Sequence, residues 1–385
     1  MLHDFDELID RTGTNSLKHD FAAQRGKPDG LLSLWVADMD FKSPPAVIEA
    51  LERRARHGIF GYSDPRSSYG KAVTGWFKER LGCELDADWL VPAPGVVFAL
   101  NMCVRAYTKP GDFCLIQSPV YYPFASSIID NKRTLLTNSL VLENGQYRID
   151  FDDLEEKMKR AKLFILCSPH NPVGRVWTRE ELVAMGELAK KYHTLVVSDE
   201  IHCDFVYGNN KHVMFSSLPF NDNLVLCTAP SKTFNLAGLH NANIFIPDKT
   251  LRQMYEDESN LTGISQLCLM GLDACEAAYL HGGPWLEDLL AYLKGNIDLV
   301  RSFLKEKLPK VKLIEPQGTY LLWLDFRELA NSEEELERIL VEKAKLWLDI
   351  GGMFGPEGKG FARMNVASPR SVIKEALERL EIGFR

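Results

Sequence analysis

Short apolar runs alternate with amphipathic stretches between about residues 90 and 230. The apolar runs read DFCLIQSP, KLFILCSP, TLVVSDE and NLVLCTAP, and helical patterns such as TREELVAMGELAKKY lie between them. Strands that alternate with helices indicate a mostly parallel sheet flanked by helices. The alternation therefore predicts an α/β fold for this part of the chain.

The pattern changes after about residue 285. A long helical stretch is followed by the strand pattern GTYLLWLDF, a helix near 333–347, a short strand FARMNVA and a closing helix, which predicts a second, smaller α/β domain. The pair Gly283–Pro284 precedes the long helix and is the best boundary. We predict an N-terminal arm with part of the small domain over 1–45, a large cofactor-binding domain over 46–284 and a small domain over 285–385.

Overall charge and hydrophobicity exclude several kinds of partner. The net charge is −8, without the basic stripe that follows nucleic-acid phosphates, and no segment approaches the run of about 20 apolar residues that a membrane span needs. The start, MLHDFDELID, lacks the apolar core of a secretory signal, and the eight cysteines form no C-x-x-C pair. We therefore expect a cytoplasmic protein with a small-molecule partner, without nucleic acid, membrane or metal.

Polar or turn-forming residues end each predicted strand of the large domain. These endings are Ser118–Pro119, Ser168–Pro169, Asp199–Glu200 and Ser231–Lys232. In open α/β sheets, ligands bind at the carboxyl ends of the strands. The sequence therefore predicts one site at this edge of the sheet.

Two of these endings carry chemistry that a pyridine cofactor would use. Lys232, in CTAPSKTFNLAGL, follows a strand and a small-residue turn, so its ammonium group would project from the sheet edge and suit a Schiff base. Alone, it would be a surface charge. Asp199, in VVSDEIHCDF, could hold a proton on a pyridine nitrogen, with Glu200 as its solvated neighbour, although a cap or loop role is commoner for an aspartate. The two together favour the cofactor site.

Other motifs offer groups for the same cofactor. Asn171, in CSPHNPVGRVW, lies in a turn that would aim its amide at a phenolic oxygen, although Asn-Pro alone is only a turn signal. The backbone amides of Gly95, Val96 and Val97, between a short strand and a helix, could hold a phosphate; an ordinary turn is the alternative.

An aromatic and a cationic residue complete the set. Tyr121, in QSPVYYPF, is favoured over Tyr122 to stack on the pyridine ring, with core packing as the alternative for either. Arg363, in GFARMNVASP, could hold a substrate carboxylate with its planar fork, with a structural ion pair as the alternative.

The motifs occur in the order of a known superfamily. The segments YSDP, PGVV, SPVYYPF, SPHNPVGRVW, SDEIHCDF, APSKTFNLAGL and FARMNVASP resemble the fold-type-I superfamily of class I and II aminotransferases, which use pyridoxal 5'-phosphate (PLP), nearly end to end. The opening FDELIDRTGTNSLKHD and the WVADMDFKSPP loop resemble the MalY/PatB-type carbon–sulfur lyases, which include cystalysin and certain cystathionine β-lyases.

The resemblance implies a homodimer with PLP near the subunit interface. It implies a Schiff base at Lys232, Asp199 on the pyridine nitrogen, Asn171 on the phenolate oxygen, Tyr121 stacking and Arg363 on the substrate carboxylate. It also assigns cofactor contacts to Ser231 and His202 and substrate contacts to Ala37, Asn171 and Tyr122. Tyr62 would reach from the partner subunit to the phosphate; a buried structural tyrosine is the alternative.

Two positions depart from the wider aminotransferase pattern. His202 stands where a tyrosine is frequent, and His240 stands where an arginine is frequent. The phosphate is then left to backbone amides, Ser231, Thr228 and Tyr62, and the phenolate loses a donor. We therefore expect somewhat weaker PLP binding.

The resemblance implies β-elimination of L-cystathionine or a related L-cysteine derivative to a thiol, pyruvate and ammonia. An aminotransferase is the alternative, because both reactions share the same early chemistry. A regulatory protein that binds a transcriptional activator is an alternative of another class. The retained Lys232, Asp199, Asn171 and Arg363 argue against a site that has lost its function.

Overall fold

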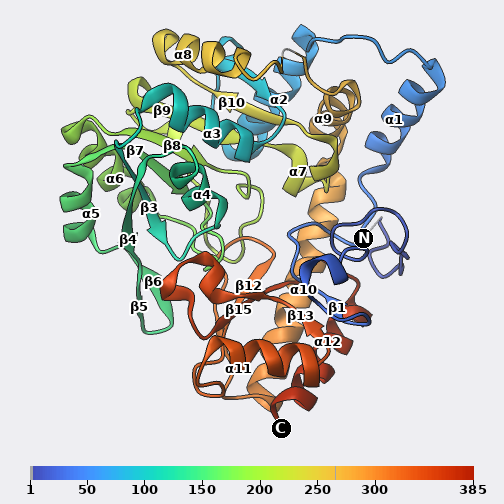
Figure 1. The fold of residues 1–385 in the computed structure, drawn as a ribbon. Coiled ribbons are helices and arrows are strands. Elements are labelled where there is room, and N and C mark those ends of the chain that lie inside the picture. The colour runs from blue at the N-terminus through green and yellow to red at the C-terminus, as the bar shows by residue number, and fades with distance from the viewer. Residues whose placement is uncertain (1–2, 265) are drawn as a thin grey trace.

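A seven-stranded sheet forms the centre of the larger part of the molecule (Figure 1). The computed structural model describes residues 3–264 and 266–385. In spatial order the strands are β2 (Leu90–Ala93), β10 (Ala242–Phe245), β9 (Leu224–Thr228), β8 (Leu195–Asp199), β7 (Ala161–Cys167), β3 (Phe113–Ser118) and β4 (Thr134–Ser139). Strand β10 runs antiparallel to both of its neighbours, and all other neighbouring pairs of this sheet are parallel. The predicted mostly parallel sheet is confirmed.

The apolar runs are continuous because helices cover both faces of this sheet. Along β7, Leu163 and Ile165 belong to one hydrophobic core, while Phe164 and Leu166 belong to another. Successive side chains of a strand point to opposite faces, so the two cores lie on opposite sides of the sheet. A strand buried on both faces needs apolar residues at every position, which explains the runs seen in the sequence.

Helices connect and cover the strands (Figure 1). Those described are α1 (Pro45–His57), α2 (Ser67–Leu81), α3 (Val96–Tyr107), α4 (Pro123–Ile129), α5 (Phe151–Met158), α6 (Arg179–Tyr192), α7 (Pro230–Thr233), α8 (Lys249–Asn260), α9 (Leu269–His281), α10 (Gly283–Lys307), α11 (Glu333–Arg338) and α12 (Arg370–Phe384). Helix α6 coincides with the predicted TREELVAMGELAKKY, and it begins at a capping box formed by Thr178 and Glu181. None of the described helices is long and apolar enough to cross a membrane.

A second, antiparallel sheet belongs to the smaller domain. Its strands in spatial order are β11 (Lys312–Ile314), β12 (Leu321–Asp325), β15 (Phe361–Asn365) and β14 (Asp349–Ile350). Beside it, β1 (Leu32–Ser33) pairs in parallel with β13 (Leu346–Trp347), so the N-terminal segment joins the C-terminal part of the chain. A short hairpin, β5 (Val141–Glu143) and β6 (Gln146–Arg148), leads into α5.

The helix predicted near 333–347 is too long. Helix α11 ends at Arg338, a π-helix follows over Ile339–Lys343, and residues 346–347 form strand β13. Local periodicity could not reveal this strand, because its partner β1 lies near the other end of the chain. Helix α10 begins at Gly283, at the predicted Gly–Pro pair. The domain ranges themselves stay a prediction.

Candidate active site

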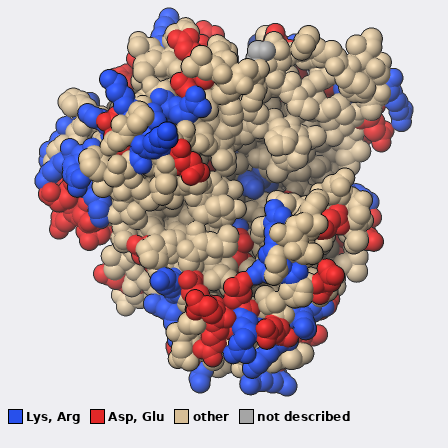
Figure 2. Space-filling model, viewed as in Figure 1, with Lys and Arg blue, Asp and Glu red and all other residues tan. Residues whose placement is uncertain are grey.

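A cavity of about 420 Å³ lies at the carboxyl ends of β7, β8 and β9. On this face the molecule is hollowed between its upper and lower parts (Figure 2). The structure brings ten of the predicted site residues to the cavity wall: Ala37, Gly95, Val96, Val97, Tyr121, Asn171, Asp199, His202, Ser231 and Lys232. The sheet edge predicted from the strand endings is therefore where these groups meet.

Lys232 lies on α7, a single helical turn that follows β9. Its Nζ donates a hydrogen bond to the carbonyl oxygen of Ala37 at 2.8 Å. Burial, together with the nearby charge of Arg363, lowers the pKa of Lys232 to about 8, although Asp38 and Asp199 act in the opposite direction. About a tenth of this lysine is therefore a neutral, nucleophilic amine at pH 7, far more than for an ordinary lysine.

Asp199 is the last residue of β8, and its carboxyl group is buried. Burial raises its pKa to about 7, although the Ile201 amide donates to Oδ1 at 3.2 Å and the charge of Lys232 acts in the opposite direction. A positive charge placed in the cavity beside this group would stabilise the carboxylate. A protonated pyridine nitrogen fits that requirement.

Glu200 is not the solvated neighbour that the sequence suggested. It is completely buried and accepts hydrogen bonds from His212 Nε2 at 2.7 Å and from the Phe215 amide at 2.9 Å. The chain folds back over the end of β8 and supplies both donors, a contact that local sequence does not reveal. Glu200 thus anchors the loop after the strand, and Asp199 alone faces the cavity.

Two buried polar groups in the cavity wall lack partners within residues 3–264 and 266–385. They are Nδ1 of His202 and the Nδ2 amide of Asn241. Burial lowers the pKa of His202 well below its usual value, so its ring is neutral. The Tyr69 hydroxyl donates to Oδ1 of Asn241 at 3.1 Å, which fixes the amide. Unpartnered buried groups at a cavity are suited to bind a polar ligand.

Asn241 was missed in the sequence because it precedes β10, the antiparallel strand that the alternating pattern did not reveal. His240, which also lines the cavity, was considered only as the replacement of an arginine. The signal that could have located Asn241 is its position directly before the apolar run ANIF, as the other site residues border apolar runs.

The N-terminus of α3 forms another part of the wall. The amides of Val96 and Val97 lie in the first turn of this 12-residue helix, where backbone N–H groups have no partner in the helix and the helix dipole is positive. A Cβ atom on Gly95 would meet nothing within 4 Å, so open space lies beside this backbone. Together with Ser231, this wall suits a phosphate. Thr228 does not contribute, because its buried hydroxyl donates to the carbonyl of Asn243.

Asn171 and Tyr121 are held together at the opposite wall. The Tyr121 amide donates to the carbonyl oxygen of Asn171 at 3.1 Å, which ties the segments after β3 and β7 together. Oδ1 of Asn171 accepts a hydrogen bond from Nη1 of Arg363 at 3.0 Å. Burial raises the pKa of Tyr121 to about 12, so its ring is an uncharged aromatic surface at neutral pH.

Arg363 reaches this wall from β15. Its Nη2 donates to the carbonyl of Trp35 at 3.0 Å and to the carboxylate of Asp349, so the ion pair considered as an alternative is present. Its guanidinium also lies over the ring of Phe354, 4.8 Å from the centroid. Its Nε is buried and has no hydrogen-bond partner within the described part of the chain. The arginine therefore keeps one donor that a bound carboxylate could use.

Three predicted residues are not among those that line this cavity, and one of them, Arg363, contacts its wall through Asn171. Tyr122 is half-exposed and borders a neighbouring cavity with Trp35 and Asp349. Tyr62 is 95% exposed, between α1 and α2, so the alternative of a buried structural tyrosine is wrong. Its role at the phosphate of a partner subunit stays a prediction.

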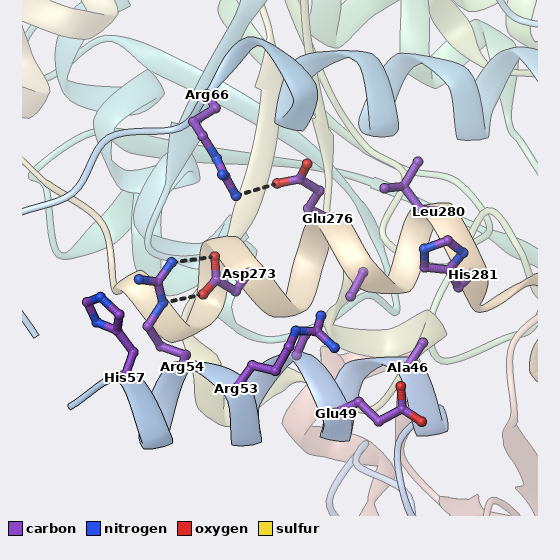
Figure 3. A pocket seen from close by; sticks show the side chains of 12 residues that line it. Ala46, Glu49, Arg53, Arg54, His57, Arg66, Asp273, Glu276, Leu280 and His281 are labelled. Carbon is purple, nitrogen blue, oxygen red and sulfur yellow. Dashed lines mark hydrogen bonds and ion pairs between the residues drawn. The ribbon is translucent and has the colours of Figure 1, made fainter. Parts of the chain in front are cut away.

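Another cavity, of about 470 Å³, lies between α1 and α9 (Figure 3). Arg54 holds Asp273 through two hydrogen bonds, from Nε at 2.6 Å and from Nη2 at 3.2 Å, and Arg66 pairs with Glu276 at 3.7 Å. These carboxylates are already neutralised. No lysine is among the described residues that line this cavity, so we place the chemistry at Lys232.

The comparisons with known proteins agree with this placement. Residues 29–380 match the model of the family "Aminotransferase class I and II", and the chain belongs to that family. Cystathionine beta-lyase PatB of Bacillus subtilis is 43% identical over 99% of both chains, and protein MalY of Escherichia coli is 34% identical over 100% of this chain and 99% of its own. The crystal structure of cystalysin from Treponema denticola has a TM-score of 0.96 at 37% identity and covers 100% of this chain and 99% of its own.

The cofactor of this chain is PLP. The cystalysin structure contains pyridoxal 5'-phosphate, and the cavity supplies a group for each part of that molecule. The amine of Lys232 suits the aldehyde, the carboxyl group of Asp199 suits the ring nitrogen, and the amides at the start of α3 suit the phosphate. The chain is thus a PLP-dependent enzyme of the PatB/MalY-type carbon–sulfur lyase family.

Replacing Lys232 with alanine removes the only lysine among the described residues that line the cavity. We expect the variant to lose the visible absorbance of covalently bound PLP. Spectra recorded after incubation with PLP and removal of the excess by gel filtration measure this. Lys162→Ala, which changes an exposed lysine at the other end of β7, is the matched control. A Lys232 variant that keeps the band contradicts the assignment.

The pKa of Lys232 also predicts a pH dependence of cofactor attachment. Only the neutral amine attacks an aldehyde, and its fraction rises with pH until the pKa of about 8 is passed. In protein stripped of PLP, we expect the rate of reconstitution to rise about tenfold per pH unit below that value and to level off above it. Stopped-flow absorbance after mixing with PLP measures the rate. A profile that keeps rising towards about 10.4, the range of an ordinary lysine, contradicts this expectation.

Proposed function

We propose that this chain is a carbon–sulfur β-lyase that converts L-cystathionine or a related L-cysteine derivative to a thiol, pyruvate and ammonia. The observation that carries the proposal is the proximity of a buried lysine of lowered pKa, Lys232, to a buried arginine, Arg363, whose Nε has no partner in the described part of the chain. The similarity to the cystathionine beta-lyase PatB supports the choice of reaction. The substrate is then an amino acid with sulfur on its Cβ atom.

PLP, when bound, withdraws electrons from the substrate and makes its Cα proton acidic. Asp199 holds the proton on the ring nitrogen, because its carboxylate is stable in this buried place only beside a positive charge. Arg363 binds the α-carboxylate through its unpartnered Nε and so fixes which substrate bond faces Lys232. These two residues therefore orient and activate the Cα–H bond.

Lys232 moves the proton. Its neutral Nζ removes the proton from Cα, and the electron pair of the broken Cα–H bond expels the sulfur from Cβ as a thiolate. The thiolate takes up a proton to leave as a thiol, and the remaining three-carbon fragment is hydrolysed to pyruvate and ammonia. No oxidant or amino acceptor is consumed in this sequence.

The proposed assembly is a homodimer in which Tyr62 of each chain reaches the phosphate of the other site. The 95% exposure of this ring supports the proposal, because exposed apolar side chains that lie together mark protein interaction surfaces. The neighbouring Phe60 is 64% exposed, so the segment between α1 and α2 presents two large rings. Both would become buried in a dimer.

We expect the purified protein to release pyruvate from L-cystathionine without any added 2-oxo acid, because elimination needs no amino acceptor. Coupled lactate dehydrogenase measures the pyruvate, and a thiol reagent measures the homocysteine, in equal amounts. Lys232→Ala serves as the inactive control. Turnover that depends on a 2-oxo acid would identify an aminotransferase instead and overturn the proposal.

A further inference from the structure

A side cavity of about 590 Å³ adjoins the active site. It is lined by the N-terminal segment, Tyr122, α11 and the strands β13 and β14. The reaction proposed above uses none of these side chains. The volume is much larger than a sulfide ion needs, so a substrate as small as cysteine would leave it unfilled.

Arg363 joins the side cavity to the active site. Its Nη1 contacts Asn171, in the wall of the first cavity, while its Nη2 contacts Trp35 and Asp349, in the wall of the second. The adjacent rings of Tyr121 and Tyr122 line one cavity each, with their centroids 5.2 Å apart. Arg363 therefore stands between the two cavities, and a substrate whose α-carboxylate binds Arg363 would lie beside the side cavity.

The wall of the side cavity is aromatic. The rings of Trp35 and Trp347 stack with their centroids 4.5 Å apart and their planes at 15°. The guanidinium of Arg25, on a short 3-10 helix (Ala23–Arg25), lies 5.5 Å from the centroid of the Trp35 ring. Arg25 and Arg363 both act on the pKa of Tyr122, so this ring lies near both cations.

Most charges at the side cavity are already satisfied. Lys27 pairs with Glu337, Asp349 pairs with Arg363, and Glu333 accepts a hydrogen bond from the Gly352 amide at 2.6 Å.

Arg25 and Glu334 also line the side cavity and form no ion pair with a described residue. Both side chains are exposed, and Glu334 also has a hydrogen bond with the Ser332 side chain, so the cavity offers one charge of each sign outside an ion pair beside an aromatic wall.

We propose that the side cavity binds the leaving-group end of the substrate and selects a leaving group that is itself an amino acid. Its carboxylate binds Arg25, its ammonium group faces Glu334, and its methylene groups lie against the tryptophans. This inference rests on the proposed lyase function. It concerns the leaving group of the substrate, which the residues that act on Cα do not select.

The test compares two substrates that share the reacting carbon atoms. L-Cystathionine carries a distal amino-acid group, whereas S-methyl-L-cysteine does not. In Arg25→Gln we expect kcat/KM for L-cystathionine to fall about tenfold or more, as for the loss of one charge-assisted hydrogen bond, mostly through KM. We expect kcat/KM for S-methyl-L-cysteine to stay within about twofold, because Arg25 would not touch it.

Two further variants complete the comparison. Arg25→Lys keeps the charge and should recover part of the loss. Arg338→Gln changes an exposed arginine on α11 that does not line the side cavity, and should leave both substrates unaffected. Equal losses for both substrates in Arg25→Gln, or no loss for either, would overturn the inference while leaving the lyase function standing. Wild-type protein that releases pyruvate from neither substrate would overturn the proposed function and the inference together.

Discussion

The buried guanidinium of Arg363 is the contact on which the site depends. A charge that is only 3% exposed is stable only when most of its donors are matched by acceptors, as Nη1 and Nη2 of Arg363 are. Those acceptors come from three distant segments: the loop after β7, the N-terminal segment and β14. Satisfying one side chain therefore fixes the small antiparallel sheet, the N-terminal segment and the central sheet relative to one another.

Burial acts on the two ionisable groups of the cavity in opposite directions. It lowers the pKa of Lys232 and raises that of Asp199, because it disfavours the charged form of both. Both pKa values therefore lie near neutral pH, whereas the pKa values of an ordinary lysine and an ordinary aspartate are far apart. Burial thus makes Lys232 a better nucleophile and leaves Asp199 an acid that a cationic ring would ionise.

The central sheet and much of the site could be predicted from the sequence, because strands buried on both faces leave continuous apolar runs. Lys232, Asp199 and Asn171 directly follow such runs or the turns after them, so their position at the sheet edge follows from the pattern.

Features that depend on distant partners could not be predicted. The pairing of Glu200 with His212 and the strand at 346–347 both require chain segments that local periodicity does not connect. Asn241 was hidden because antiparallel β10 lacks the helix-to-strand spacing of its neighbours.

The pairing of β1 with β13 has a consequence for the order in which the protein is built. Leu32 leaves the ribosome long before its partner Leu346 has been made. The segment between them includes the whole central sheet, which can form first from its own closely spaced strands. Ala37, whose carbonyl oxygen receives the hydrogen bond of Lys232, lies just after β1. A newly made chain therefore contains both Ala37 and Lys232 before the strand that pairs with β1 has been made, so the segment that positions the reactive amine is secured only after Leu346 has been synthesised.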